Sequence, residues 1–139
     1  MITSADEQRV LDLVPTQLYL NGQWVDAEGG KTLDVNDPAT GKKLLSIADA
    51  SYADGQKAIA AAHEAQAAWA RTAPRVRAEL LRAAFEKVTE MADEFAILMS
   101  LEMGKPFAEA KGEVAYGAEF LRWFSEEAAR INGRYQTAP

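Results

Sequence analysis

The chain has 139 residues, of which 48% are hydrophobic, and its formal net charge at pH 7 is −6. A chain of this size is one domain or less. The absence of a basic stripe argues against a nucleic-acid partner. The sequence also has no uncharged apolar run of about 18 residues, the length that would cross a membrane. It has no cysteine, which excludes disulfides, thiolate zinc sites and thiol catalysis by these residues; together with a first stretch unlike a secretory signal, this agrees with a cytoplasmic location.

The first third of the chain is predicted to be an arm followed by short strands. Residues 1–17 are expected to form an N-terminal arm, either mobile or carrying a short peripheral helix, and residues 18–48 have the alternation of a small antiparallel β-meander. Asn21-Gly22 predicts a two-residue type I′ hairpin turn, because both residue types accept positive φ angles. Turn formers are dense again over 36–41. Strands this short and few are not stable alone in water, so they are expected to lie on another part of the fold.

From residue 51 to residue 132 the period becomes helical, and three or four helices are predicted. Ser51, followed three residues later by Asp54, has the spacing of a capping box. Pro74 suits the first turn of a second helix, and Gly104 suits the end of a later one. An apolar seam with steps of three and four, broken near its middle, is expected to face another element. Its members are Leu81, Ala84, Val88, Met91, Phe95 and Leu98.

The last predicted helix, which Pro106 opens and Asn132-Gly133 ends, carries two apolar stripes. Its seam consists of Phe107, Ala110, Val114, Gly117, Leu121, Phe124, Ala128 and Ile131. Tyr116, Phe120 and Trp123 form a second stripe that is displaced around the helix. Because a surface helix needs only one apolar stripe, this helix is expected either to be covered on two sides or to line a cavity.

Most of the usual chemical motifs are absent or have a plain structural interpretation. The sequence has neither G-x-G-x-x-G nor a P-loop, so it predicts no phosphate cradle. His63 is the sole histidine and lacks partners for a metal site. Glu126 and Glu127 are adjacent and diverge by about 100° on a helix, which favours two surface residues over an acid/base pair. Lys105, beside Gly104, is interpreted either as an anion contact or as a complement to the carbonyls of the preceding helix.

The stripe of Tyr116, Phe120 and Trp123 carries the main functional hypothesis. Aromatic residues at helical spacing are commonly part of a core. The alternative is that they line a substrate passage, where aromatic walls would grip a short aliphatic aldehyde and exclude water.

Several motifs in this order resemble the N-terminal part of aldehyde dehydrogenases. They are the Leu20-Asn21-Gly22-Gln23-Trp24 hairpin, the Asn36-to-Gly41 turn, the Leu101-Glu102-Met103-Gly104-Lys105-Pro106 corner and the aromatic helix that follows. Glu109 to Glu113 and Trp123-Phe124-Ser125-Glu126-Glu127 are similar to the branch that oxidises semialdehydes, most closely the succinate-semialdehyde dehydrogenases.

The resemblance implies an α/β fold for the intact protein. Residues 18–133 would be the N-terminal part of its dinucleotide-binding domain, and 134–139 would begin a strand used in oligomerisation, in a homodimer or homotetramer. The family's aldehyde tunnel is partly walled by the helix that matches Pro106 to Asn132, which implies Tyr116 and Phe120 as substrate-binding residues.

The resemblance also implies the reaction. A cysteine thiolate attacks the aldehyde, hydride passes to NAD or NADP, and water hydrolyses the resulting thioester. The cysteine, the general base and the cofactor contacts would all lie outside these 139 residues, so no catalytic, cofactor-binding or metal-binding residue is assigned within them.

Three functional hypotheses follow. The chain is the N-terminal segment of a succinate-semialdehyde dehydrogenase, the same segment of an aldehyde dehydrogenase with another substrate, or a non-catalytic helical interaction module. If the apolar seams find no partners within the chain, large apolar patches should be exposed, which favours the first two hypotheses.

Overall fold

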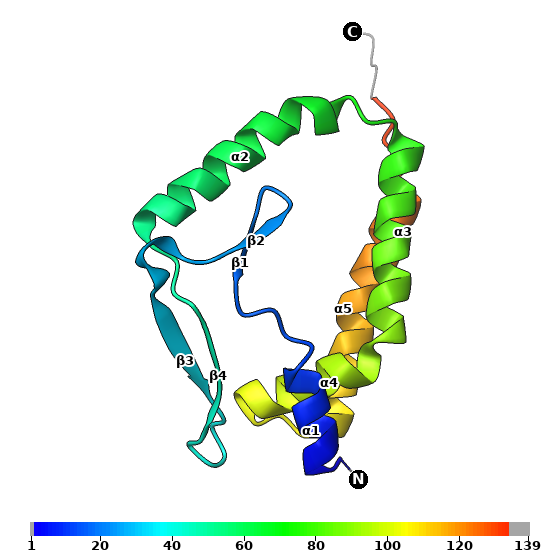
Figure 1. Ribbon diagram of the computed structural model, residues 1–139. Helices are drawn as coiled ribbons and strands as arrows, with labels where there is room; N and C mark the ends of the chain where they lie inside the picture. Colours follow the sequence, from blue (N-terminus) through cyan, green and yellow to red (C-terminus); the bar gives the residue numbers. More distant parts are fainter. Residues whose placement is uncertain (1, 134–139) are drawn as a thin grey trace, which may run out of the picture.

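The computed structural model describes residues 2–133 and shows strand pairs followed by helices (Figure 1). The predicted oligomerisation strand at 134–139 lies outside the described residues. In chain order the elements are α1 (Ser4–Leu11), β1 (Leu18–Leu20), β2 (Gln23–Val25), the 3-10 turn η1 (Glu28–Gly30), β3 (Thr32–Asn36), β4 (Lys43–Ala48), α2 (Tyr52–Ala70), α3 (Pro74–Glu90), α4 (Ala92–Met103) and α5 (Phe107–Ala128).

The predicted strands form, and their antiparallel pairing is confirmed. In the first pair, β1 and β2, Leu20 faces Gln23 across a two-residue turn in which Asn21 has a φ of 49° and Gly22 a φ of 80°. These angles are those of the predicted type I′ turn. β3 and β4 form the second hairpin.

The strands do not form one continuous meander, because they are divided into two separate two-stranded sheets. The chain between β2 and β3 turns through η1, where Gly29 and Gly30 take φ angles of 79° and 65°. Because of this turn, β3 does not pair with β2. A few backbone bonds connect the second hairpin to its surroundings instead, including one of 2.8 Å from Ala48 N to Thr16 O.

Local chemistry accounts for the helix boundaries. Ser51 caps α2 in a capping box with Asp54, and Pro74 occupies the first turn of α3. The expected break lies at Met91, between α3 and α4, and Gly104 ends α4 in the left-handed conformation with a φ of 72°. α5 ends at Ala128, four residues before the predicted Asn132. Arg130 N bonds there to Glu127 O at 2.8 Å, so the chain closes in a tighter three-residue turn.

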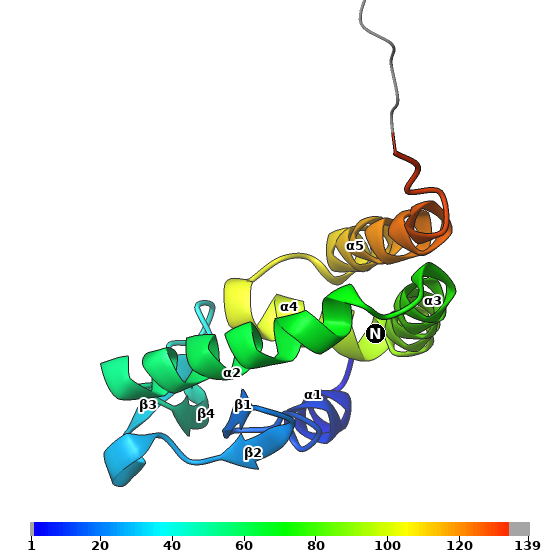
Figure 2. The ribbon, with the colours of Figure 1, turned by 90° about the horizontal axis from the view of Figure 1, so that it is seen from above.

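The centre of the fold is the contact between α4 and α5, and α3 packs along α5 (Figure 2). Ala96 and Ala110 are fully buried and Val114 is nearly so, with Val88 and Phe107 packed against them. Small side chains let the helix backbones approach closely. The two predicted seams meet only in part, because Phe95, Phe124 and Ile131 remain 41%, 54% and 74% exposed, and the buried residue near the middle of α5 is Ala118 rather than Gly117.

The N-terminal arm contains the short helix that was one of its two predicted forms. Thr3 and Asp6 make a capping box at the start of α1. Val10 is 2% exposed, and Arg9 Nη1 lies 2.8 Å from Glu94 Oε1 of α4. These contacts hold α1 against α4.

The remaining helices leave much of their apolar surface uncovered. α2, the α3–α5 pair, α4 and the β3–β4 hairpin form the sides of an open frame around β1 and β2 (Figure 1). Tyr52 and Ile59 on α2 are 83% and 73% exposed. No helix within residues 2–133 is both long enough and apolar enough to span a membrane.

Candidate functional site

The aromatic stripe of Tyr116, Phe120 and Trp123 lies on the face of α5 that points away from α3 and α4. The buried side of α5 consists of Ala110, Val114, Ala118 and Ser125. The three aromatic side chains are 68%, 49% and 62% exposed, so the described residues do not enclose them in a core. One helix thus presents small residues to its neighbours and large rings to the outside.

Tyr116 and Phe120 are in direct contact. Their ring centroids are 5.1 Å apart and the ring planes meet at 88°, an edge-to-face arrangement that is favourable for aromatic pairs. With Glu119, Trp123 and Phe124 they line a shallow hollow of about 230 Å³. The structure therefore brings the two predicted substrate-binding residues together on one surface.

The charge beside this hollow is balanced. Glu119 Oε2 accepts hydrogen bonds from Arg122 Nη2 at 2.6 Å and Arg122 Nε at 2.9 Å. The carboxylate is therefore paired with the guanidinium one helical turn away. The hollow offers aromatic surface and neutral donors rather than an unpaired charge.

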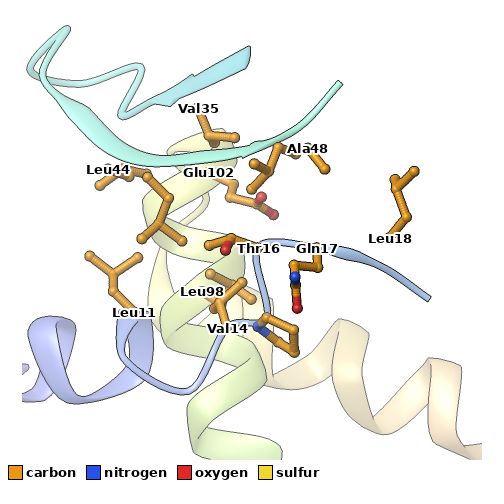
Figure 3. A pocket seen from close by; sticks show the side chains of 13 residues that line it. Leu11, Val14, Thr16, Gln17, Leu18, Val35, Leu44, Ala48, Leu98 and Glu102 are labelled. Carbon is orange, nitrogen blue, oxygen red and sulfur yellow. The ribbon is translucent and has the colours of Figure 1, made fainter. Parts of the chain in front are cut away.

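A second, more enclosed cavity of about 210 Å³ lies between β4, α4 and the segment that joins α1 to β1 (Figure 3). Leu11, Val14, Leu44 and Leu98 supply much of its apolar wall. Its polar side chains are Thr16, Gln17 and Glu102, and the Gln17 amide donates to Asp26 Oδ1 at 2.7 Å. This arrangement offers no acid/base pair or nucleophile with its base, and it is a packing space between the strand pair and α4.

Lys105 has a partner that neither interpretation of the sequence named. Its ammonium group pairs with the Glu113 carboxylate, two turns into α5. The lysine ties the corner at Gly104 to the helix that follows.

Other charged side chains of α3 and α5 form local ion pairs. On α3, Arg82 and Glu86 form an ion pair of 2.8 Å at i,i+4 spacing. Glu127 is bound by Arg130 at 2.8 Å and does not pair with Glu126. Among residues 2–133, no cluster of histidine, cysteine, aspartate or glutamate could hold a metal ion.

Asp54, for which the sequence predicts only a capping role, is a buried carboxylate. It is 3% exposed, and its Oδ2 atom accepts hydrogen bonds of 3.0 Å from the backbone N–H groups of Glu28 and Ser51. These bonds hold the pKa of the Asp54 carboxyl below its usual value. The residues next to Asp54 in the sequence do not predict the hydrogen bond from Glu28, because Glu28 lies 26 positions away.

The described residues do not fit a dinucleotide cofactor. A pyrophosphate is usually held by a glycine-rich turn at the N-terminus of a helix, and the start of α2 is already occupied by its own Asp54 and Ser51. α3 and α5 begin next to Pro74 and Pro106, in segments without such a turn. No cofactor contact is therefore assigned to these residues.

The chain belongs to the aldehyde dehydrogenase family, whose model matches residues 24–139. Two of the curated relatives are named semialdehyde dehydrogenases. The succinate-semialdehyde dehydrogenase of Paenarthrobacter nicotinovorans is 64% identical over 96 residues, which are 69% of this chain and 21% of that protein. The glutarate-semialdehyde dehydrogenase of Pseudomonas aeruginosa is 49% identical over 117 residues, 84% of this chain and 24% of that protein.

The crystal structure of succinate-semialdehyde dehydrogenase from Burkholderia pseudomallei has the same fold in the matched part. It superimposes with a TM-score of 0.87 at 40% identity and covers 92% of this chain and 27% of that chain. This match confirms the expected aldehyde dehydrogenase-like fold. The chain spans about a quarter of the length of these relatives, and the part it matches is their N-terminal quarter.

Proposed function

We propose that this chain is the N-terminal segment of an NAD- or NADP-dependent aldehyde dehydrogenase that oxidises succinate semialdehyde to the dicarboxylic acid. The observation that carries the proposal is the 64% identity to a succinate-semialdehyde dehydrogenase over 96 residues. The aromatic face of α5 supports it, because an exposed wall of rings suits an aliphatic substrate.

Within that enzyme, the role proposed for this chain is to form part of the wall of the aldehyde passage. Tyr116 and Phe120 would contact the substrate through their edge-to-face pair. The nucleophile and the cofactor contacts are assigned to the remainder of the enzyme, since the chain has no cysteine and its helix starts do not fit a dinucleotide. The assembly proposed for the intact enzyme is a homodimer or homotetramer, and the proposed location is the cytoplasm.

The alternative is an aldehyde dehydrogenase of different specificity, with glutarate semialdehyde as the favoured substrate. The observation in its favour is the 49% identity to a glutarate-semialdehyde dehydrogenase, which extends over more of this chain. Both substrates have an aldehyde at one end and a carboxylate at the other. They differ by one methylene, a difference that hydrophobic contacts discriminate by about 10- to 200-fold.

The test is a substrate series with the full-length protein that contains this chain. Formation of reduced nicotinamide would be followed with 4-oxobutanoate, 5-oxopentanoate and butanal, each with NAD and with NADP. The proposal expects the highest kcat/KM for 4-oxobutanoate. A higher value for 5-oxopentanoate would establish the alternative, and inactivity toward all three aldehydes would refute both.

The role of the aromatic wall is tested by truncating Phe120 to alanine in the same protein. We expect the ratio of kcat/KM between 4-oxobutanoate and 5-oxopentanoate to change while the melting temperature changes little, because Phe120 lies outside the buried contact of α5 with its neighbours. The matched control is Leu121→Ala on the packed side of α5, which should lower the melting temperature and leave the ratio unchanged. If Phe120→Ala only lowers the melting temperature, the ring is a packing residue.

A further inference from the structure

The N-terminal arm is fastened to two different parts of the fold. At its first attachment, Arg9 Nη1 lies 2.8 Å from Glu94 Oε1 of α4, and the neighbouring Val10 is 2% exposed. At its second attachment, Thr16 O accepts a hydrogen bond of 2.8 Å from Ala48 N at the end of β4. A segment of a few residues therefore connects the first turn of α4 with the base of the β3–β4 hairpin.

Between these attachments, side chains of the arm fill the space that separates the hairpin from α4. Leu11 and Val14 lie beside the cavity of about 210 Å³, whose wall includes Leu44 of β4 and Leu98 of α4 (Figure 3). The arm is thus an intermediate layer between a strand and a helix. Because β4 meets α4 partly through this layer, undocking of the arm would remove contacts from both elements.

The arm and α5 contact opposite faces of α4. Ala92, Ala96 and Met99 belong to the contact with α5, whereas Glu94 and Leu98 meet the arm. The residues that meet the arm follow Ala92 and Ala96 by two positions, which is about 200° around the helix. The contact with the arm can therefore be lost without opening the contact between α4 and α5.

The α1 end is the weaker attachment of the arm. α1 has eight residues, of which Val10 is the buried one, and an isolated helix needs about 12–15 residues to be even marginally stable in water. Once undocked, α1 is therefore expected to melt. Segments with few buried apolar contacts open locally at a lower free energy than the core.

We propose that residues 4–16 form a releasable strap, so that departure of α1 from α4 frees the base of the β3–β4 hairpin while the contact between α4 and α5 persists. This conformational device uses residues that precede the matched family range, 24–139. It is carried by contacts within the described chain and does not rest on the proposed function.

The experiment is hydrogen exchange of the full-length protein, measured by mass spectrometry on peptides covering residues 4–11, 44–49 and 107–114. Val10→Ala removes two methyl groups from a buried side chain, so exchange of 4–11 and of 44–49 should be about 10-fold faster. The peptide 107–114, which begins α5, should exchange at an unchanged rate.

A double-mutant cycle tests the ion pair of the strap. Arg9→Ala should speed exchange of 44–49 by about 2- to 5-fold, the range for a partly exposed pair. It should have no further effect in a protein that already carries Glu94→Ala. The matched control is Arg82→Ala, which breaks an ion pair of the same 2.8 Å length within α3 and should leave 44–49 unchanged.

Two results with Val10→Ala would overturn the inference. An unchanged rate for 44–49 would make the arm a peripheral attachment that does not hold the hairpin. An equal rise in 44–49 and 107–114 would make the arm part of the helical core rather than a separable strap. Exchange is measured without aldehyde or cofactor, so either result is distinct from failure of the proposed function.

Discussion

The 139-residue chain on its own is expected to self-associate through the apolar surface that its helices leave uncovered. Its accessible surface is 10387 Å², whereas a globular monomer of 15.2 kDa exposes about 7,100 Å². If the residues outside the described part contributed the full area of an unfolded chain, they would account for about 1,100 Å² of the difference. About 2,200 Å² remains, which exceeds the roughly 800 Å² that one partner contributes to a standard protein interface.

The perturbation is to replace three exposed apolar side chains with polar ones: Ile59→Lys, Phe120→Ser and Trp123→Ser. These side chains are 73%, 49% and 62% exposed, so the changes remove surface apolarity without opening the core. We expect sedimentation velocity to show oligomers for the unchanged chain at tens of micromolar and a shift toward monomer for the triple variant. The variant should also bind less of the dye ANS.

The control is Val114→Ser, which places a hydroxyl at a side chain that is 7% exposed. It should increase dye binding, because it disturbs the contact between α4 and α5. The reasoning would be refuted by an unchanged chain that is monomeric, melts cooperatively and has a radius of gyration of about 14 Å, the value for a compact domain of this length. In such a protein the exposed apolar side chains of the helices would be covered by other residues of the same chain.

Three smaller predictions concern the ends of helices and can be measured in the full-length protein. Ser51→Ala should destabilise the start of α2 by about 1 kcal/mol, the usual value of an N-cap, seen as faster hydrogen exchange of its first-turn amides; unchanged exchange would show that the cap of α2 is dispensable. Gly104→Ala should cost about 1–2 kcal/mol, because alanine would have to adopt a φ near 72°, and the melting temperature should fall; no fall would mean that the corner rearranges. The backbone bonds to Asp54 lower its pKa, so they stabilise the fold above about pH 4, the ordinary value, and this stabilisation is lost as the pH falls through the lowered pKa. Asp54→Asn should remove that acid dependence from the exchange of the Glu28 amide, and an Asn variant that retains the unchanged protein's acid profile would contradict this assignment.

Features that depend on a few neighbouring residues were predictable from the sequence. The turn at Asn21-Gly22, the capping box at Ser51 and the stop at Gly104 each follow from backbone angles or bonds that those residues alone allow. The seams were predictable only in part, because helical periodicity assigns residues to faces but does not say how much of each face a neighbour covers, and Phe124 and Ile131 of the predicted seam are 54% and 74% exposed.

Features that depend on distant partners were not predictable. Two separate sheets replace the expected meander because the path between β2 and β3 depends on how η1 meets the start of α2, where Glu28 N bonds to Asp54. The partner of Lys105 became known only when the corner placed Glu113 beside it. Spacing alone assigned Tyr116 and Phe120 to one face of a helix, but the exposure of that face required the packing of α3 and α4 on the other.

The division of α5 into two faces explains why its packing and its proposed binding role can be changed separately. Alanine and serine residues on the inner face let the backbone of α5 approach its neighbours closely, so stability depends on close contact there and tolerates little added volume. The outer rings contribute little to that contact, since Tyr116 and Phe120 remain half to two-thirds exposed. A change at Phe120 should therefore alter the surface offered to a substrate, whereas a change at Leu121 should alter the stability of the helix pair. If both changes shifted the melting temperature equally, the two faces would be energetically coupled, and the proposed separation of binding from packing would be wrong.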